Sequence, residues 1–368
     1  MTKGSVNSHK RKSSLDNLVN PPASKITRCS PEEALFDKMK KPEEYLIRAE
    51  KDDENEDKIE NEHGGDDGEG EDAEIGNDLQ DEAAYLSRDE GPTSTERELE
   101  KGFPAEDADE ENKSARHFSH GSYLVQGKLD HGMEDYIFAE HRNINGYDLG
   151  LYAIFDGHAG RVVAKYLQRH LFERILNEPD FWKNPVRALK RTCKAVDEEI
   201  LEKIADSRGG STAVVAILIN GVRLLVANVG DSRAILCRNG SAKQITVDHE
   251  PQREKDLVES RGGFVTKAPG CVPRVDGVLA MSRAFGDGRL KEHITAEPDV
   301  MVQNITEDTE FIILASDGLW KVMTNEEACE CIKDMDGAKK AAKKLVKEAL
   351  VQGSYDDISC IVVMFSTS

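Results

Sequence analysis

The sequence has no apolar run that could cross a membrane. Its longest run, residues 213–219, is far shorter than the roughly 20 apolar residues that a membrane-spanning helix needs. Residues 1–30 also lack the apolar stretch of a secretory signal peptide. We therefore expect a soluble protein without a membrane partner, located in the cytoplasm, the nucleus or both.

An excess of basic charge is missing as well. The 368 residues contain 70 Asp and Glu against 49 Lys and Arg, so the formal net charge is -21. Proteins that bind DNA or RNA neutralise phosphates with Lys and Arg, and anionic membrane surfaces attract the same residues. The composition therefore argues against direct binding to nucleic acid or to anionic membranes.

Cysteine patterns of zinc sites and disulfide frameworks are also absent. The seven cysteines are scattered, odd in number and without a Cys-x-x-Cys pair. Cys329 and Cys331 stand two residues apart in a predicted helix, so their side chains point to different faces. The sequence thus predicts reduced thiols in an intracellular protein. Dinucleotide-binding, Walker, zinc-protease and serine-hydrolase motifs are missing too.

The first third of the chain differs in composition from the rest. The cluster Lys10-Arg11-Lys12 is basic, whereas residues 52–72 are densely acidic. Such a segment buries too little apolar surface to fold, so we predict a disordered tail over residues 1–115. The basic cluster is either part of a nuclear import signal or an ordinary charged tail. The acidic tract either recruits a basic partner or only keeps the chain soluble.

Residues 118–368 alternate between apolar strand patterns and helical patterns. Asn220-Gly221 and Asn239-Gly240 are typical of hairpin turns. Because the elements come in blocks with hairpins, they favour an α+β fold with antiparallel sheets and helices packed outside. The predicted strands are 118–127, 151–155, 211–219, 222–229, 234–237, 277–281, 311–315 and 358–365, and the predicted helices are 161–175, 185–205, 257–261, 325–332 and 338–350.

Acidic side chains recur at the ends of the predicted strands. Asp156 and Asp317 each follow an apolar run, and Glu134 and Asp356 each precede one. Each Asp-Gly pair taken alone is more typical of a turn. Converging carboxylates repel one another unless cations lie between them, and oxygen ligands suit Mg²⁺ or Mn²⁺. The four carboxylates carry about -4, which two divalent ions balance, so the pattern favours a dinuclear centre.

Seven short motifs follow one another in the second part of the chain. They are Met133-Glu134-Asp135, Phe155-Asp156-Gly157-His158, Gly209-Gly210-Ser211-Thr212-Ala213, Asn228-Val229-Gly230-Asp231-Ser232-Arg233, Ser282-Arg283-Ala284-Phe285-Gly286-Asp287, Ala315-Ser316-Asp317-Gly318-Leu319-Trp320 and Asp356-Asp357-Ile358-Ser359. This series resembles the protein phosphatase 2C family of metal-dependent serine/threonine phosphatases, in particular its plant members. The resemblance covers residues 118–368, which we interpret as one catalytic domain.

The resemblance implies a β-sandwich of two antiparallel sheets, flanked by pairs of α-helices, with metal ions at one end. It implies that Asp156 bridges two Mg²⁺ or Mn²⁺ ions and that Asp317 and Asp356 complete the shell of one. Glu134 and the carbonyl of Gly157 would coordinate the other ion, and Asp135 would lie just outside the ligands. A weaker third ion would involve Asp231 together with Asp317.

The resemblance also implies a mechanism for hydrolysis of phosphoserine and phosphothreonine in phosphoprotein substrates. A metal-bridged hydroxide would attack phosphorus in line, without a phosphoenzyme. His158 would act as general acid on the departing seryl or threonyl oxygen, its alternative being a structural histidine. We expect the enzyme to be a monomer.

Three positions depart from the family pattern. Asp130 stands where many members have an arginine that binds substrate phosphate, so Lys128 is the predicted substitute and His131 the alternative. Lys321 stands where many members have an aspartate for the third ion, and its ammonium group should weaken that site or partly replace the ion's charge. Asp357 replaces the usual Asn, while the ligand Asp356 is kept.

Two other functions stay open at this point. A pseudophosphatase would capture phosphoproteins without turnover, and the missing arginine and Lys321 are compatible with it. A nuclear or histone-binding scaffold would instead depend on the acidic tail. Metal-dependent release of phosphate from a phosphopeptide distinguishes the enzyme from both.

Overall fold

The computed structural model describes residues 116–204 and 208–366, and the predicted tail of residues 1–115 lies outside them. The strands are β1 (Phe118–Val125), β2 (Asp135–Ile144), β3 (Tyr147–His158), β4 (Gly210–Ser211), β5 (Ala213–Ile219), β6 (Arg223–Val229), β7 (Arg233–Arg238), β8 (Ser241–Gln244), β9 (Val265–Thr266), β10 (Arg274–Val275), β11 (Phe285–Gly286), β12 (Asp299–Asn304), β13 (Thr309–Ala315) and β14 (Ile358–Phe365). The helices are α5 (Val162–Leu176), α6 (Pro185–Glu199) continued by a π-helix (Ile200–Ile204), α7 (Lys255–Ser260), α8 (Asp317–Trp320), α9 (Asn325–Ile332) and α10 (Ala338–Val351).

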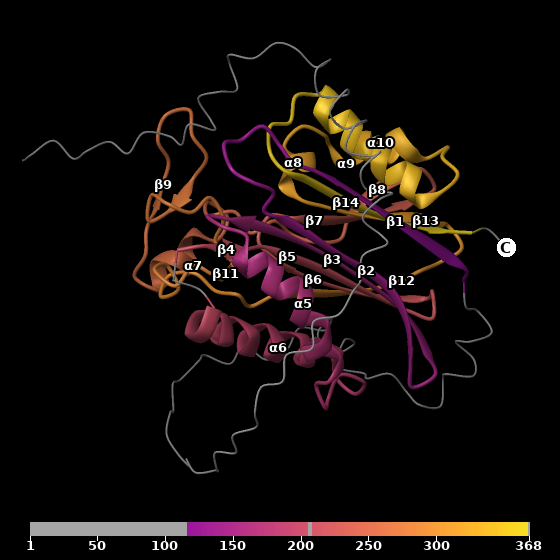
Figure 1. The fold of residues 1–368 in the computed structure, drawn as a ribbon, viewed down its shortest axis with the longest axis horizontal. Coiled ribbons are helices and arrows are strands. Elements are labelled where there is room, and N and C mark those ends of the chain that lie inside the picture. The colour runs from indigo at the N-terminus through magenta and orange to yellow at the C-terminus, as the bar shows by residue number, and fades with distance from the viewer. Residues whose placement is uncertain (1–115, 205–207, 367–368) are drawn as a thin grey trace, which may run out of the picture.

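Two antiparallel sheets form the centre of the molecule. One has the strand order β1-β14-β13-β7-β8. The other has the order β11-β4-β3-β5-β6-β12, with β2 also paired to β3. The helices α8, α9 and α10 cover the outer face of the first sheet, and α5 and α6 cover that of the second (Figure 1). The expected α+β sandwich of two antiparallel sheets with flanking helices is thus confirmed.

The all-apolar strand β5 shows why the layers stack in this way. Val214 and Leu218 point into the core between the two sheets, whereas Val215 and Ile217 point into the core beneath α5 and α6. Side chains alternate between the faces of a strand, so a strand with apolar residues on both faces is stable only when both faces are covered. The apolar run read from the sequence therefore specifies a central strand.

The predicted start of a helix at Pro185, after Asn184, is confirmed. The side chain of Asn184 accepts a hydrogen bond from the backbone N–H of Arg187 at 3.0 Å, and Pro185 occupies the first turn of α6. Helix α9 begins with a capping box, in which Thr324 and Glu327 bond to each other's backbone N–H groups. These caps fix where both helices start.

Three sequence-based expectations need correction or limits. Residues 277–281 do not form a strand, since a turn after Asp276 and Gly277, both at positive φ, takes their place. Five cysteines are free thiols, as predicted, but Cys271 is disulfide-bonded. Across 116–204 and 208–366, no helix is both long and apolar enough to span a membrane.

Candidate metal centre

Five acidic residues come to one end of the sandwich from separate strand ends. Asp156 lies near the end of β3, directly opposite Asp135 at the start of β2. Asp317 follows β13 as the first residue of α8, and Asp356 lies just before β14. Asp231 stands in the turn between β6 and β7. This end of the molecule is the one where α8 and β4 are labelled in Figure 1, so the structure brings the predicted acids together.

The electrostatics of these acids are unfavourable without a cation. Burial and the charge of Asp135 raise the pKa of Asp156 well above its ordinary value. Burial and the charge of Asp317 raise the pKa of Asp231 to about 7. Burial also raises the pKa of Asp317, although Lys321 opposes the rise. Each acid is thus destabilised in its charged form by burial and by like charges.

One buried oxygen identifies Asp231 as a candidate ligand. Its Oδ1 atom is shielded from solvent and has no hydrogen-bond partner within residues 116–204 and 208–366. A buried carboxylate oxygen without a donor is costly, and a bound cation removes that cost. The donor set at this end, which consists of carboxylates and no thiol, fits Mg²⁺ or Mn²⁺.

The predicted ligands are not arranged around a common metal position in this structure. Within the described part of the chain, no three His, Cys, Asp or Glu side chains are arranged to hold a metal ion together. Lys321 instead lies between two of the predicted ligands, with Nζ 2.7 Å from Asp317 Oδ2 and 2.7 Å from Asp356 Oδ2. Partial loss of hydration would lower the pKa of Lys321, but the charges of both aspartates outweigh it and raise the pKa well above its ordinary value. The lysine is therefore a cation at this site.

The backbone around Gly157 is held by Glu134. The N–H of Gly157 donates to the carbonyl of Glu134 at 3.2 Å, and the N–H of Gly160 donates to Glu134 Oε1 at 2.8 Å. A Cβ atom on Gly157 would lie only 2.6 Å from the carbonyl oxygen of Glu134. Glycine is therefore needed here for a close approach of two backbones, and Glu134 lies beside the carbonyl expected to share its ion.

Asp357 organises the same corner in a way that the sequence did not predict. Its Oδ1 accepts from the N–H of Gly127 at 2.7 Å and its Oδ2 accepts from the N–H of Glu134 at 2.8 Å. Both carboxylate oxygens are thus used to fix the loop that carries Lys128 and Glu134. The motif Asp356-Asp357 signalled the position, but only the fold reveals these bonds across more than 200 residues of sequence.

His158 is paired with an acid whose role the sequence analysis missed. His158 Nε2 lies 2.7 Å from Asp287 Oδ2, and Asp287 is 5% exposed. Burial alone would lower the pKa of His158, but the bond and the charge of Asp287 raise it above the ordinary value. A Cβ on Gly210 would lie 2.2 Å from Asp287 Oδ2 and 2.6 Å from His158 Nε2. Gly210 therefore leaves the space in which the pair forms.

The predicted phosphate-binding residue lies at the edge of this corner. The N–H of Lys128 donates to the carbonyl of Tyr355 at 2.6 Å, and its Nζ lies 5.1 Å from the centre of the Tyr355 ring. His131, the alternative, bonds through Nδ1 with the carbonyl of Gly132 at 2.9 Å and lies 4.0 Å from Glu134 Oε2. The charges of Asp356 and Asp357 act on His131 and help to raise its pKa. Lys128 follows Gly127, whose N–H bonds to Asp357. Both residues therefore stay candidates for contact with substrate.

These features can now be compared with known proteins. A sequence profile of the protein phosphatase 2C family matches residues 125–358. The chain belongs to this family. Probable protein phosphatase 2C 28 from Arabidopsis thaliana is 60% identical over 251 residues, covering 68% of this chain and 74% of the relative. Probable protein phosphatase 2C 62 from Oryza sativa subsp. japonica is 55% identical over 256 residues, covering 68% and 88%.

Solved structures of the family share the fold. Serine-threonine phosphatase 2C from Toxoplasma gondii superposes with a TM-score of 0.62 at 23% identity, covering 68% of this chain and 95% of that one. A C. elegans sex determining protein superposes with a TM-score of 0.60 at 26% identity, covering 68% and 65%. Because of this family match and these plant relatives, we identify the chain as a metal-dependent serine/threonine protein phosphatase with the protein phosphatase 2C fold.

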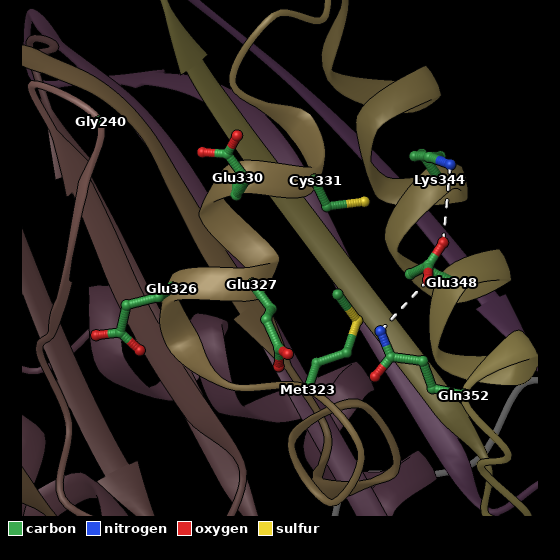
Figure 2. A pocket seen from close by; sticks show the side chains of 9 residues that line it. All are labelled: Gly240, Met323, Glu326, Glu327, Glu330, Cys331, Lys344, Glu348 and Gln352. Carbon is green, nitrogen blue, oxygen red and sulfur yellow. Dashed lines mark hydrogen bonds and ion pairs between the residues drawn. The ribbon is translucent and has the colours of Figure 1, made fainter.

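A second acidic region does not qualify as the site. A groove of about 690 Å³ lies between α9 and α10, lined by glutamates of both helices (Figure 2). Glu327 Oε2 accepts from the N–H of Thr324 at 2.8 Å, and Glu348 lies 3.8 Å from Lys344 and accepts from Gln352 at 3.3 Å. None of the lining residues is a predicted ligand or catalytic group, and these glutamates already have local partners.

Proposed function

We propose that the protein hydrolyses phosphoserine and phosphothreonine in protein substrates at a centre of two divalent ions, Mg²⁺ or Mn²⁺. The observation that supports this most strongly is the convergence of Asp156, Asp231 and Asp317. These three acids are half-buried at one end of the sandwich and their pKa values are raised, and one oxygen of Asp231 has no hydrogen-bond partner among the described residues.

The ligand assignment comes from the family resemblance. Asp156 would bind both ions, Asp317 and Asp356 would bind one of them, and Glu134 with the carbonyl of Gly157 would bind the other. Asp231 would help to hold a weaker third ion. Bound ions would supply positive charge against the phosphoryl oxygens and a water of lowered pKa as nucleophile.

His158 is the residue that would protonate the leaving group. The bond and the charge of Asp287 raise the pKa of His158 above its ordinary value, which favours the protonated imidazole that a general acid needs. Since Nε2 bonds to Asp287, Nδ1 is the ring atom left to carry a proton to the departing seryl or threonyl oxygen, and the described part of the chain offers Nδ1 no hydrogen-bond partner. Asp287 would act as a positioning residue that holds the ring and its charge. Lys128 would bind the substrate phosphate.

Hydrolysis of a phosphothreonine peptide by the full chain tests the proposal. We expect phosphate release with Mn²⁺ or Mg²⁺, loss of release in EDTA, and recovery when excess Mn²⁺ is added back. Release that continues unchanged in EDTA, or no release with either ion, would overturn the proposed function.

Capture of phosphoproteins without turnover is the alternative that the sequence left open. Membership of the protein phosphatase 2C family and the protein phosphatases among the relatives argue against it. The same assay tests it, because a pseudophosphatase would bind the phosphopeptide in the presence of Mn²⁺ and release no phosphate.

A further inference from the structure

Lys321 directly follows α8, and its side chain reaches the candidate metal centre. It stands four residues after Asp317, and residues at this spacing lie on the same side of a helical turn. Asp356 reaches the same point from the loop before β14. The Lys321 side chain is 56% exposed, compared with 17% for Asp317 and 29% for Asp356. The charged end therefore contacts the acids, while the stem has open solvent beside it.

The ammonium group of Lys321 partly neutralises the carboxylates of Asp317 and Asp356, which a metal ion would otherwise neutralise. It bonds to one oxygen of Asp317 and one oxygen of Asp356, both at 2.7 Å, and its charge also lowers the pKa of Asp231 against the rise from burial. A lysine ammonium has donors only, so it cannot itself be a ligand to a metal ion. A divalent ion bound to the same two oxygens would lie within a few ångströms of it, where like charges repel strongly.

We propose that Lys321 is an internal cation that competes with one divalent ion for Asp317 and Asp356. This inference rests on the proposed function, because it assumes that these aspartates bind a metal ion. Without metal, the lysine holds the two acids together. When the ion binds, the lysine side chain swings into solvent, which its exposed stem permits. Metal affinity is therefore lower than the acids alone would give.

Calorimetric titration of the metal-free full chain with Mn²⁺ tests this competition. Lys321→Met keeps much of the stem and removes the charge, so we expect its dissociation constant for Mn²⁺ to fall about tenfold. Lys321→Arg keeps a positive charge and should stay closer to the wild type. Lys344→Met is the matched control, because Lys344 is also exposed and also lies four residues from a glutamate partner.

Two thermal measurements complete the binding experiment. In EDTA, Lys321→Met should melt about 2–4 °C below the wild type, since its acids lose their counter-ion. With saturating Mn²⁺ the variant should melt no lower than the wild type. If Lys321→Met binds Mn²⁺ with the wild-type dissociation constant, competition is refuted. If the wild type binds no Mn²⁺ at all, the proposed function itself fails, and the two failures are thus distinguishable.

Displacement of the lysine can be observed directly, without measuring activity. An amine-acylating reagent followed by mass spectrometry reports how accessible each lysine is. Labelling of Lys321 should rise several-fold when Mn²⁺ saturates the protein, while labelling of Lys344 stays the same. Equal labelling of Lys321 in EDTA and in Mn²⁺ would contradict its release.

Discussion

Two groups of carboxylates in this protein lie in opposite electrostatic situations. At the candidate metal centre, Asp156 and Asp231 are half-buried among other acids and their pKa values are raised. Near α7, Arg283 bonds to both Glu254 and Asp299, which we call the Arg283 cluster. Burial alone would raise the pKa of Glu254, but Arg283 and Ser282 outweigh it and lower the pKa.

The difference distinguishes structural acids from acids that await a ligand. Arg283 provides a fixed cation that joins the start of β12 to the residue before α7, so the Arg283 cluster is complete within the chain. At the metal centre the only counter-charge in contact with the described acids Asp317 and Asp356 comes from one exposed lysine. We infer that the protein leaves these acids under-neutralised because divalent ions complete the site.

The largest expected effect comes from the residue proposed to bridge the ions. Asp156→Asn removes one charge and one ligand oxygen, so phosphopeptide turnover with Mn²⁺ should fall at least about a thousandfold. Steady-state phosphate release measures this. Asp334→Asn, on the exposed surface after α9, is the control and should retain full turnover. Near-normal activity of Asp156→Asn would show that Asp156 does not bridge the ions.

Removing the cation of the Arg283 cluster should affect stability instead. Arg283→Met leaves Glu254, which is 14% exposed, without its partner, and should cost about 3 kcal/mol of unfolding free energy. Urea unfolding monitored by circular dichroism measures this cost. Added Mn²⁺ should stabilise Arg283→Met no more than it stabilises the wild type. If Arg283→Met were as stable as the wild type, the Arg283 cluster would not be structural.

The third prediction concerns the proton donor. His158→Gln should lower kcat on a phosphothreonine peptide about a hundredfold. It should lower kcat much less on p-nitrophenyl phosphate, whose leaving group needs no proton. Asp287→Asn should show the same selectivity with a smaller loss, about tenfold, because it acts through His158. Equal losses on both substrates would argue for a purely structural histidine.

The smallest expected effect is an acid sensitivity in the Arg283 cluster. The bond from His249, with the charge of Arg283, lowers the pKa of Asp299 to about 2. A carboxylate whose pKa is lower in the folded state stabilises the fold above its unfolded pKa. Its contribution is therefore present above about pH 4 and is lost as the pH falls toward 2. The stability gap between wild type and Asp299→Asn should shrink over that interval in pH-dependent urea unfolding, and a constant gap would contradict the assignment.

The sequence predicted most of the long elements because their signals are local. Continuous apolar runs located β5, β13 and β14, and the cap at Asn184 located the start of α6. Strand β2 was missed although it has ten residues, since most of its side chains are partly or fully exposed and its apolar signal is weak. Strands β8 and β12 and the two-residue strands β9, β10 and β11 were also missed, and residues 277–281 were wrongly predicted as a strand. These short segments gain their structure from neighbours distant in sequence, and their own propensities carry little information.

The same division applies to the site. Acids after apolar runs marked Asp156 and Asp317, since a strand end is a local feature. The bonds of Asp357 to Gly127 and Glu134, the pairing of His158 with Asp287, and the position of Lys321 between two aspartates all depend on the packed sandwich. Side chains that position other side chains do so through three-dimensional contacts. A single sequence can therefore indicate where such a residue stands, but not which residue it bonds to.

Counting bound ions tests the metal centre most directly. Metal-free full-length protein is titrated with Mn²⁺ in parallel for the wild type, Asp156→Asn and Glu326→Gln, the last being an exposed glutamate of the groove. We expect two ions per wild-type chain, the same number for Glu326→Gln, and a clear loss of binding in Asp156→Asn. Wild-type protein that binds no Mn²⁺, or Asp156→Asn that binds both ions with unchanged affinity, would contradict the proposal that the half-buried acids at the end of the sandwich hold the ions.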